Sequence, residues 1–398
     1  MKIGILTFHS QLNYGGVLQC WALQSALKKM GHTVVVVDRW HNADNSLLER
    51  GYNKYGLVRW AKFWVKVLLG LGDLNDLLRI KRTKKFLKSR LNLTPYHFVE
   101  WKDAPKELGI DVLVVGSDQV WHCGNWGDPR VYLLEGAPQI PAIAYAVSFG
   151  MTELPERLGV GARGAENFAA EPIYKRGLAK FRAISCRECE GVEICKRLGF
   201  DAVHIVDPTL LAWGDGAKGC SKDKKNRELV CYFLSERIED HISELDRFAR
   251  RNNCRVKVFM DGAWLLPFPS NLSRIKSLLW RWKLQLCSQV EIMDSAGPEE
   301  FYDAFKNARW VVSDSFHALM FSICNGCDVR IIKPSTESRR KMFARIEEFA
   351  LHAKGSLIVD SVSDALASFS EGERVSYDYE WLECRCRESE EWLRMALR

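Results

Sequence analysis

Residues 309–326 read Arg-Trp-Val-Val-Ser-Asp-Ser-Phe-His-Ala-Leu-Met-Phe-Ser-Ile-Cys-Asn-Gly. The stretch opens with the apolar run 310–312, typical of a buried β-strand, followed by small polar residues of the kind that precede helices. Apolar side chains then recur at helical spacing, and Asn325-Gly326 supplies a helix stop. This order predicts a strand, a tight polar turn and a helix. In an open α/β sheet, such a turn lies at the carboxyl end of a strand, where ligands bind.

His317 falls in the first turn of this predicted helix. Free N–H groups and a partial positive charge make a helix N-terminus suitable for an anion. A capped surface helix with an incidental histidine would give the same local pattern. The rest of the chain has to decide between these alternatives.

Composition and charge describe an ordinary soluble protein with more than one core. The chain has 398 residues, of which 47% are hydrophobic and 27% are charged. This length exceeds what a single core usually supports, so we expect two domains. The formal net charge of +7 favours anionic ligands. The sequence has no nucleic-acid-binding motif, so we expect no nucleic-acid partner.

Targeting and cysteine patterns indicate a cytoplasmic protein without a metal. The N-terminal apolar run is too short for a signal peptide, and no run reaches transmembrane length. Thirteen cysteines in such a chain should be free thiols. The pairs Cys186-x-x-Cys189 and Cys324-x-x-Cys327 resemble zinc ligand spacings, but they fall at a strand end and in a helix rather than on turns. We therefore expect packed thiols.

The remaining chain alternates between strands and helices. A strand at 2–7, a glycine-containing turn at 13–16, a helix at 17–30 and a strand at 33–37 form a βαβ unit. The turn lacks the G-x-G-x-x-G fingerprint, so no dinucleotide is implied. Further strands are expected at 111–115, 141–146, 181–185, 229–234, 255–260, 289–293, 310–313 and 329–333.

This pattern predicts an α/β fold with two Rossmann-like domains that face each other across a cleft, as in the glycosyltransferase-B architecture, and a C-terminal helix. We expect an N-terminal domain over 1–214 with a helical insertion at about 45–100, and a Gly- and Lys-rich linker over 215–227. The C-terminal domain should cover 228–360, with a helical tail over 361–398.

Residues 57–90 are expected to be helical and strongly basic on one side. From Arg79 to Arg90 there are seven basic residues and no acidic one, and Trp60, Phe63 and Trp64 lie on an apolar face. Such a helix can lie on an anionic membrane surface. It can equally be an insertion that packs on its own domain and exposes a solvated basic face.

Motifs in a fixed order resemble the polysaccharide pyruvyl transferase family over nearly the whole chain. Ala318 stands where the family usually has Gly, and Cys186 where it often has Val. The matching segments are Asn13-Tyr14-Gly15, Leu18-Gln19, Ala22-Leu23-Gln24, Val115-Gly116-Ser117-Asp118-Gln119-Val120-Trp121, Tyr145-Ala146-Val147-Ser148-Phe149-Gly150, Ile184-Ser185-Cys186-Arg187-Glu188, Val206-Asp207-Pro208-Thr209-Leu210-Leu211, Gly297-Pro298-Glu299-Glu300-Phe301 and Ser313-Asp314-Ser315-Phe316-His317.

The resemblance implies transfer of the enolpyruvyl group of phosphoenolpyruvate to a sugar diol, which forms a pyruvate ketal. It implies no cofactor besides this donor and no metal. The acceptor would be a glycan or lipid-linked sugar, bound on the N-terminal domain, and peripheral contact with the inner membrane face would follow. Two alternatives remain: a nucleotide-sugar glycosyltransferase of the same architecture, and a non-catalytic glycan-binding relative. The presence of both Arg187 and His317 argues against the second.

Phosphoenolpyruvate needs cations, N–H groups and a proton donor. We expect His317 to be the general acid and Arg187 to bind a carboxylate or phosphate. Arg187 could instead pair with Glu188 or Glu190 at a helix start, and Asp314 could be a helix cap. Further substrate contacts are expected from Asn13, Tyr14, Gly15, Ser117, Asp118, Gln119, Ser148, Asp314, Ser315 and Arg345.

Overall fold

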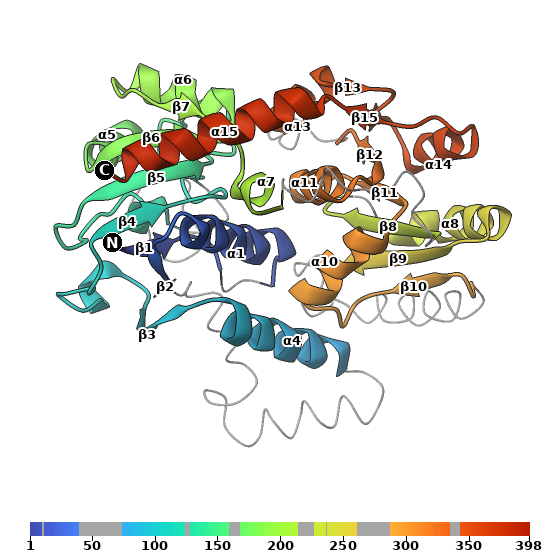
Figure 1. Ribbon diagram of the computed structural model, residues 1–398, viewed down its shortest axis with the longest axis horizontal. Helices are drawn as coiled ribbons and strands as arrows, with labels where there is room; N and C mark the ends of the chain where they lie inside the picture. Colours follow the sequence, from blue (N-terminus) through green and yellow to red (C-terminus); the bar gives the residue numbers. More distant parts are fainter. Residues whose placement is uncertain are drawn as a thin grey trace.

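The protein contains two parallel β-sheets, each flanked by helices, that lie side by side (Figure 1). The computed structural model describes residues 1–9, 12–39, 74–123, 128–158, 168–213, 227–235, 237–260, 287–334 and 343–398. The expected linker falls largely on residues 214–226, outside these ranges. The domain boundaries given above therefore stay predictions.

The first sheet is parallel throughout. Its central strands are almost wholly apolar because both faces of the sheet are covered. Within the described residues, the strand order is β3 (Leu93–Phe98), β2 (Thr33–Arg39), β1 (Lys2–Leu6), β4 (Val112–Val115), β5 (Ala142–Val147), β6 (Phe181–Cys186) and β7 (Val203–His204).

The second sheet is also parallel, and its strands, numbered along the chain, have the same spatial order 3-2-1-4-5-6 as the first six strands of the first sheet. In each sheet, this order changes direction between strands 1 and 4, and doubly wound folds bind ligands at such a point. In the described part of the chain, the order is β10 (Val290–Ile292), β9 (Arg255–Met260), β8 (Glu228–Phe233), β11 (Trp310–Ser313), β12 (Asp328–Ile332) and β14 (Ile358–Val359).

These sheets confirm the predicted fold class of two Rossmann-like α/β domains with a C-terminal helix. A short antiparallel pair, β13 (Ala353–Lys354) with β15 (Ser376–Tyr377), adjoins the second sheet. The described helices include α1 (Tyr14–Lys29), α4 (Leu74–Arg90), α6 (Cys189–Arg197), α10 (Pro298–Asn307), α11 (Phe316–Asn325), α13 (Ala344–Leu351) and α15 (Tyr379–Ala396). Further described helices are α5 (Ala170–Leu178), α7 (Pro208–Trp213), α8 (Ile238–Asn252) and α14 (Val362–Ser370).

Helix α1 begins three residues earlier than the sequence indicated. The side chain of Asn13 accepts a hydrogen bond from the backbone N–H of Gly16 and so caps the helix at Tyr14. The two glycines expected in the turn therefore form the first turn of α1. This placement brings helical backbone, rather than a loop, to the cleft.

Helix α4 of the first domain forms ion pairs with α10 of the second domain. Its Arg82 pairs with Glu300 of α10 at 3.2 Å, and its Arg90 pairs with Glu299 at 2.6 Å. Residues 93–98, inside the range of the expected helical insertion, form strand β3 of the first sheet. The part of that range over residues 40–73, with Trp60, Phe63 and Trp64, lies outside the described residues.

Helix α15 returns from the second domain and lies against the first (Figure 1). Ser389 accepts a hydrogen bond from the backbone N–H of Val206 at 3.0 Å, and Trp392 packs near Tyr145. The chain thus crosses between the domains a second time through α15. Over the described ranges, no helix combines the length and the hydrophobicity that crossing a membrane requires.

Candidate functional site

The candidate site lies where the carboxyl ends of the two sheets face each other. On the first sheet, the turn after β4 carries Ser117 and Asp118, and Asp118 adopts a left-handed backbone conformation with φ of 73°. On the second sheet, the turn after β11 leads into α11 and His317. Both turns follow strands next to the point where the strand order reverses, as expected for a ligand site.

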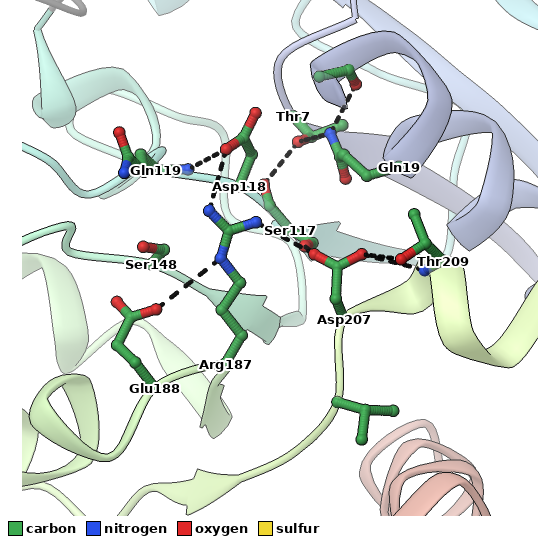
Figure 2. A network of polar contacts seen from close by, with 12 residues as sticks. Thr7, Gln19, Ser117, Asp118, Gln119, Ser148, Arg187, Glu188, Asp207 and Thr209 are labelled. Atoms are coloured by element: carbon green, nitrogen blue, oxygen red, sulfur yellow. Dashed lines mark hydrogen bonds and ion pairs between the residues drawn. The ribbon is translucent and has the colours of Figure 1, made fainter. Parts of the chain in front are cut away.

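Arg187, directly after β6, is the centre of a buried charge network (Figure 2). Its guanidinium donates to Asp118 and to Asp207, each at 3.1 Å, and lies 3.8 Å from Glu188. Burial disfavours the charge on Arg187, but the three carboxylates outweigh this effect and raise its pKa above the ordinary value. Arg187 therefore stays charged and holds three acidic side chains together.

Asp207 is the network's most fully satisfied member, and the sequence did not mark it as a site residue. It accepts hydrogen bonds from Ser117 Oγ, Arg187 Nη1, and the backbone N–H and hydroxyl of Thr209. Burial would raise the pKa of Asp207, but His317, Arg187 and the Thr209 bonds, in that order, hold it below its usual range, where His317 is itself protonated. Asp207 therefore remains ionised. Its place in the matching segment 206–211 was the available signal.

Glu188 fixes the neighbouring turn after β5. Its Oε1 accepts from the backbone N–H groups of Phe149 and Gly150, at 2.8 and 3.4 Å. The predicted site residue Ser148 lies in this turn, and its hydroxyl accepts from Gly150 N at 3.1 Å. The ion pair between Arg187 and Glu188 weighed in the sequence analysis is present, but it is the longest of the three contacts made by Arg187.

His317 lies at the start of α11 with only 9% of its surface exposed. Its Nε2 atom is buried and has no hydrogen-bond partner. Burial lowers the pKa of His317 to about 4; Asp118 and Asp207 act to raise it, and Arg187 and Arg345 to lower it. The imidazole is therefore neutral at pH 7, and an anion that contacts it would favour its protonation.

Gly15, in the first turn of α1, packs directly against the ring of His317 across the domain interface. A Cβ atom at position 15 would lie 2.6 Å from Cγ and 2.8 Å from Cε1 of His317, distances that Cβ atoms do not adopt. At Gly16, a Cβ atom would meet nothing closer than Asp118 Oδ2, at 3.3 Å. Of these two glycines, only Gly15 needs the absence of a side chain to let the domains meet.

Replacing Gly15 by alanine should therefore impair the site. Alanine normally stabilises a helix relative to glycine by roughly 0.5–1 kcal/mol. Here the methyl group must displace His317, and such overpacking costs roughly 1–3 kcal/mol. We expect a lower midpoint of urea unfolding for Gly15→Ala and a smaller effect for the matched variant Gly16→Ala. Equal stabilities of the two variants would contradict this interpretation.

Arg345, on α13, is a second cation at the site. Its guanidinium lies 4.8 Å from the ring centroid of Phe316, and that of Arg187 lies 5.1 Å from the same centroid. Nε and Nη1 of Arg345 are buried and have no hydrogen-bond partner. Burial, followed by Arg187, lowers the pKa of Arg345 to about 10, so the group is still charged at pH 7. Arg345 thus presents unused, desolvated donors beside His317.

Two predicted site residues serve structural contacts between elements. The hydroxyl of Tyr14 donates to the carbonyl of Ala296 in the second domain, and its ring stacks on Phe301. The carboxylate of Asp314 accepts from the backbone N–H groups of Leu234 and Ser235. Asp314 is therefore not the cap of α11, because two backbone donors from the turn after β8 use its oxygens.

The other predicted residues line the two turns. Ser315 is the N-cap residue of α11, but its side chain makes no capping hydrogen bond. Ser117 is buried, and its carbonyl accepts from Thr7 Oγ1. The backbone N–H of Gln119 donates to Asp118 Oδ1 at 2.8 Å, which fixes the orientation of that carboxylate. The structure thus joins Ser117, Asp118 and Arg187 in one network and places Gly15 against His317. Asn13, Tyr14 and Asp314 make structural contacts instead.

The sequence matches one known protein family over most of its length. The profile described as polysaccharide pyruvyl transferase matches residues 13–336, which include Arg187, Asp207 and His317. The chain belongs to the polysaccharide pyruvyl transferase family. The protein is thus placed among transferases that act on polysaccharides, and the resemblance stated from the motifs is confirmed. No curated protein matches the sequence.

Several solved structures share the general arrangement at low similarity. UDP-GlcNAc 2-epimerase from Neisseria meningitidis, bound to UDP-GlcNAc, has 9% identity over 100% of this chain and 99% of that chain, with a TM-score of 0.48. UDP-GlcNAc 2-epimerase from Methanocaldococcus jannaschii has 13% identity over 93% and 92%, with a TM-score of 0.46. The E. coli heptosyltransferase WaaC with ADP has 12% identity over 94% and 99%, with a TM-score of 0.39. Similarity this low carries no information about what the pyruvyl transferase binds.

Proposed function

We propose that this polysaccharide pyruvyl transferase uses phosphoenolpyruvate as its donor and forms a pyruvate ketal on a sugar diol. The observation that carries the proposal is that Arg345 and His317 both have buried side-chain nitrogens without a hydrogen-bond partner. Buried polar groups are normally satisfied, and groups that are not often serve a ligand. A small dianion or trianion such as phosphoenolpyruvate would satisfy both side chains at once.

The donor site would be completed by the start of α11. The first backbone N–H groups of this helix have no side-chain cap, and helix N-termini favour anions. Arg345 would bind the carboxylate or the phosphate through two N–H groups. Arg187 would act differently from our initial expectation, since its fork already binds Asp118 and Asp207. We assign Arg187 the role of positioning these two carboxylates.

His317 would supply the proton in the first chemical step. Transfer of a proton from the imidazolium to the methylene carbon of the donor leaves an oxocarbenium-like centre at the neighbouring carbon. The negative charge of the bound donor would raise the pKa of His317 from about 4 and so favour the protonated form. General acid catalysis of this kind typically contributes a factor of roughly 10²–10⁴ in rate.

Asp118 is the residue we assign to the acceptor hydroxyl. Its Oδ1 atom is held by Arg187 and by the backbone of Gln119. Its Oδ2 atom lies on the side of α1, near Gly16. A sugar hydroxyl that attacks the cationic carbon must lose its proton, and Asp118 can accept it. Phosphate then departs with the proton held by Asp118 and leaves a second cationic centre. The second hydroxyl attacks this centre and passes its proton to His317, which closes the ketal.

A binding screen and a release assay test this proposal against its alternative. We expect phosphoenolpyruvate to raise the unfolding temperature and nucleotide sugars to have no such effect, because a ligand that binds only the folded state stabilises it. Incubation of the donor with a panel of lipid-linked or nitrophenyl sugars should release phosphate. Stabilisation by nucleotide sugars alone would instead favour a glycosyltransferase.

The exposed face of α4 supports a peripheral membrane contact, which we propose for lipid-linked acceptors. Among the described basic residues of this helix, Arg79 is buried and Arg82 and Arg90 pair with α10. The lysines lie three, four and seven positions apart, so they share one exposed face of the helix. This lysine face consists of Lys81, Lys84, Lys85 and Lys88.

We expect weak, salt-sensitive binding to vesicles that contain anionic lipids and no binding to neutral vesicles. Each lysine near such a surface contributes on the order of 1 kcal/mol. Replacing the lysine face by four glutamates should abolish co-sedimentation. The matched control replaces four exposed lysines elsewhere, with the same change in net charge: Lys28, Lys106, Lys333 and Lys354. Failure of the wild-type protein to co-sediment at low salt would leave the lysine face as a solvated surface.

A further inference from the structure

The imidazole of His204, at the end of β7, lies where three distant segments of the chain meet. Its Nε2 atom is 3.3 Å from Glu348 Oε2 on α13 and 3.3 Å from the carbonyl oxygen of Arg187. Its Nδ1 atom is 3.1 Å from Arg385 Nη2 on α15 and 3.5 Å from Cys189 Sγ at the start of α6. Arg385 also donates to the carbonyl of His204 at 3.0 Å.

The partners of His204 fix its protonation. A guanidinium can only donate, so Nδ1 must accept from Arg385 and carries no proton. The ring proton then lies on Nε2 and points toward Glu348 and the Arg187 carbonyl, both of which accept. Burial, followed by the positive charge of Arg385, lowers the pKa of His204 to about 4. His204 is therefore neutral at pH 7, and both of its ring nitrogens make hydrogen bonds that link β7 to α13 and α15.

Both residues that accept from His204 Nε2 are close to the candidate site: Arg187 belongs to it, and Glu348 lies on the helix that carries Arg345. Arg187 holds Asp118 and Asp207 through its side chain. Glu348 lies on α13 three residues after Arg345, close to one helical turn. Arg345 has buried donors without partners and lies near Arg187, an arrangement that repulsion and desolvation disfavour. Contacts elsewhere on α13 must therefore hold Arg345 in place.

We propose that His204 is a positioning residue for the donor site, held by Arg385 of the C-terminal helix. It fixes the helix that carries Arg345 against the strand end that carries Arg187. Donor affinity thus depends on α15, although α15 itself contributes no side chain to the donor pocket we describe. This inference rests on the proposed function for the identity of the donor.

Calorimetric titration with phosphoenolpyruvate tests the connection from the side of α15. We expect Arg385→Gln to raise the dissociation constant about tenfold, the usual effect of losing one charged hydrogen bond. Turnover at saturating donor should change less than about twofold, because His317 and Asp118 keep their contacts. Arg385→Lys should recover part of the affinity, since an ammonium group can still donate to Nδ1 or to the His204 carbonyl. The matched control is Arg387→Gln, an exposed arginine of the same helix, which should bind like wild type.

The outcomes separate this inference from the proposed function. If the wild-type protein does not bind phosphoenolpyruvate, the proposed function fails. If the wild-type protein binds and folded Arg385→Gln binds equally well, the positioning role of His204 is wrong. A fall in turnover with unchanged affinity would also overturn it, because it would place the effect on chemistry rather than on Arg345.

Cys189 offers an independent approach that leaves Arg385 unchanged. Its exposed thiol lies beside Nδ1 of His204, so a bulky adduct there must push the ring from its partners. Alkylation with N-ethylmaleimide should weaken phosphoenolpyruvate binding by the wild-type protein about as much as Arg385→Gln does. The same treatment of Cys189→Ser should have no effect on affinity. Alkylation at Cys189, verified by mass spectrometry, without loss of affinity would contradict the proposal.

Discussion

Replacing His317 by alanine or glutamine is expected to lower the turnover of pyruvyl transfer by roughly 10²–10⁴, the usual contribution of a general acid. The described structure gives Nε2 of His317 no hydrogen-bond partner, so the substitution breaks no such bond of that atom. Glutamine should therefore preserve the fold better than alanine, which removes more packing. The measurement is phosphate release at saturating donor and acceptor, together with the unfolding midpoint.

Proton uptake provides a second observable for the same residue. With a pKa of about 4, His317 is neutral in the free protein at pH 7. If a bound donor raises this pKa, binding must take up protons in the window between the two values. Titration in buffers of different ionisation enthalpy should detect this uptake, and His317→Gln should reduce it. The exposed His97 provides the matched control, His97→Gln. Turnover within a few-fold of wild type for His317→Gln would place the proton donor elsewhere.

Arg187→Met should produce the largest loss of stability, roughly 3–5 kcal/mol, because it leaves buried carboxylates without their cation. The affected groups are Asp118, Asp207 and Glu188. Arg187→Lys keeps the charge but cannot bridge two carboxylates through one planar fork, so an intermediate loss is expected. Urea unfolding at pH 7 measures both. Wild-type stability of the methionine variant would show that the network contributes nothing.

The pH dependence of this loss has a definite sign. In the wild-type protein, the pKa of Asp207 lies below its usual range, so its contribution to stability is present above the unfolded-state pKa and disappears at lower pH. In Arg187→Met, Asp207 loses this cation and should protonate at a higher pH than in the wild-type protein. The difference in unfolding free energy between the two proteins should therefore shrink from pH 7 toward pH 4. Arg187→Lys should also lower turnover, because it displaces Asp118, which we assign to the acceptor hydroxyl.

The strands were predictable from the sequence because parallel, two-sided burial leaves a local signature. The apolar runs that became β4, β5 and β11 were placed within one residue at each end. The start of α1 was harder to predict, since the capping bond of Asn13 competes with the turn propensity of two glycines. Strand β3 was missed because its short, mixed sequence lies in a range dominated by a helical pattern.

The composition of the site was predictable only in part. Arg187 and His317 stood out because they follow strands, and both lie at the interdomain site. The pairing of side chains was not predictable, since the Arg187–Asp118 contact spans 69 residues and the His204–Arg385 contact spans 181. No periodicity or local spacing encodes such contacts, which depend on how the two sheets and α15 come together. The close approach of Gly15 to His317 is likewise a property of the domain interface.

The return of α15 to the first domain sets the connectivity of the two domains. Strand β1 belongs to the first sheet and helix α15 contacts the same domain, so the second domain is inserted into the first in the topological sense. A cut in the connection between α7 and β8 would therefore leave two fragments that still share an interface along α15. Two separately produced halves, 1–213 and 227–398, should therefore associate through the contacts of α15 with the first domain. Helix α15 thus acts as a noncovalent link that limits how far the two domains can separate.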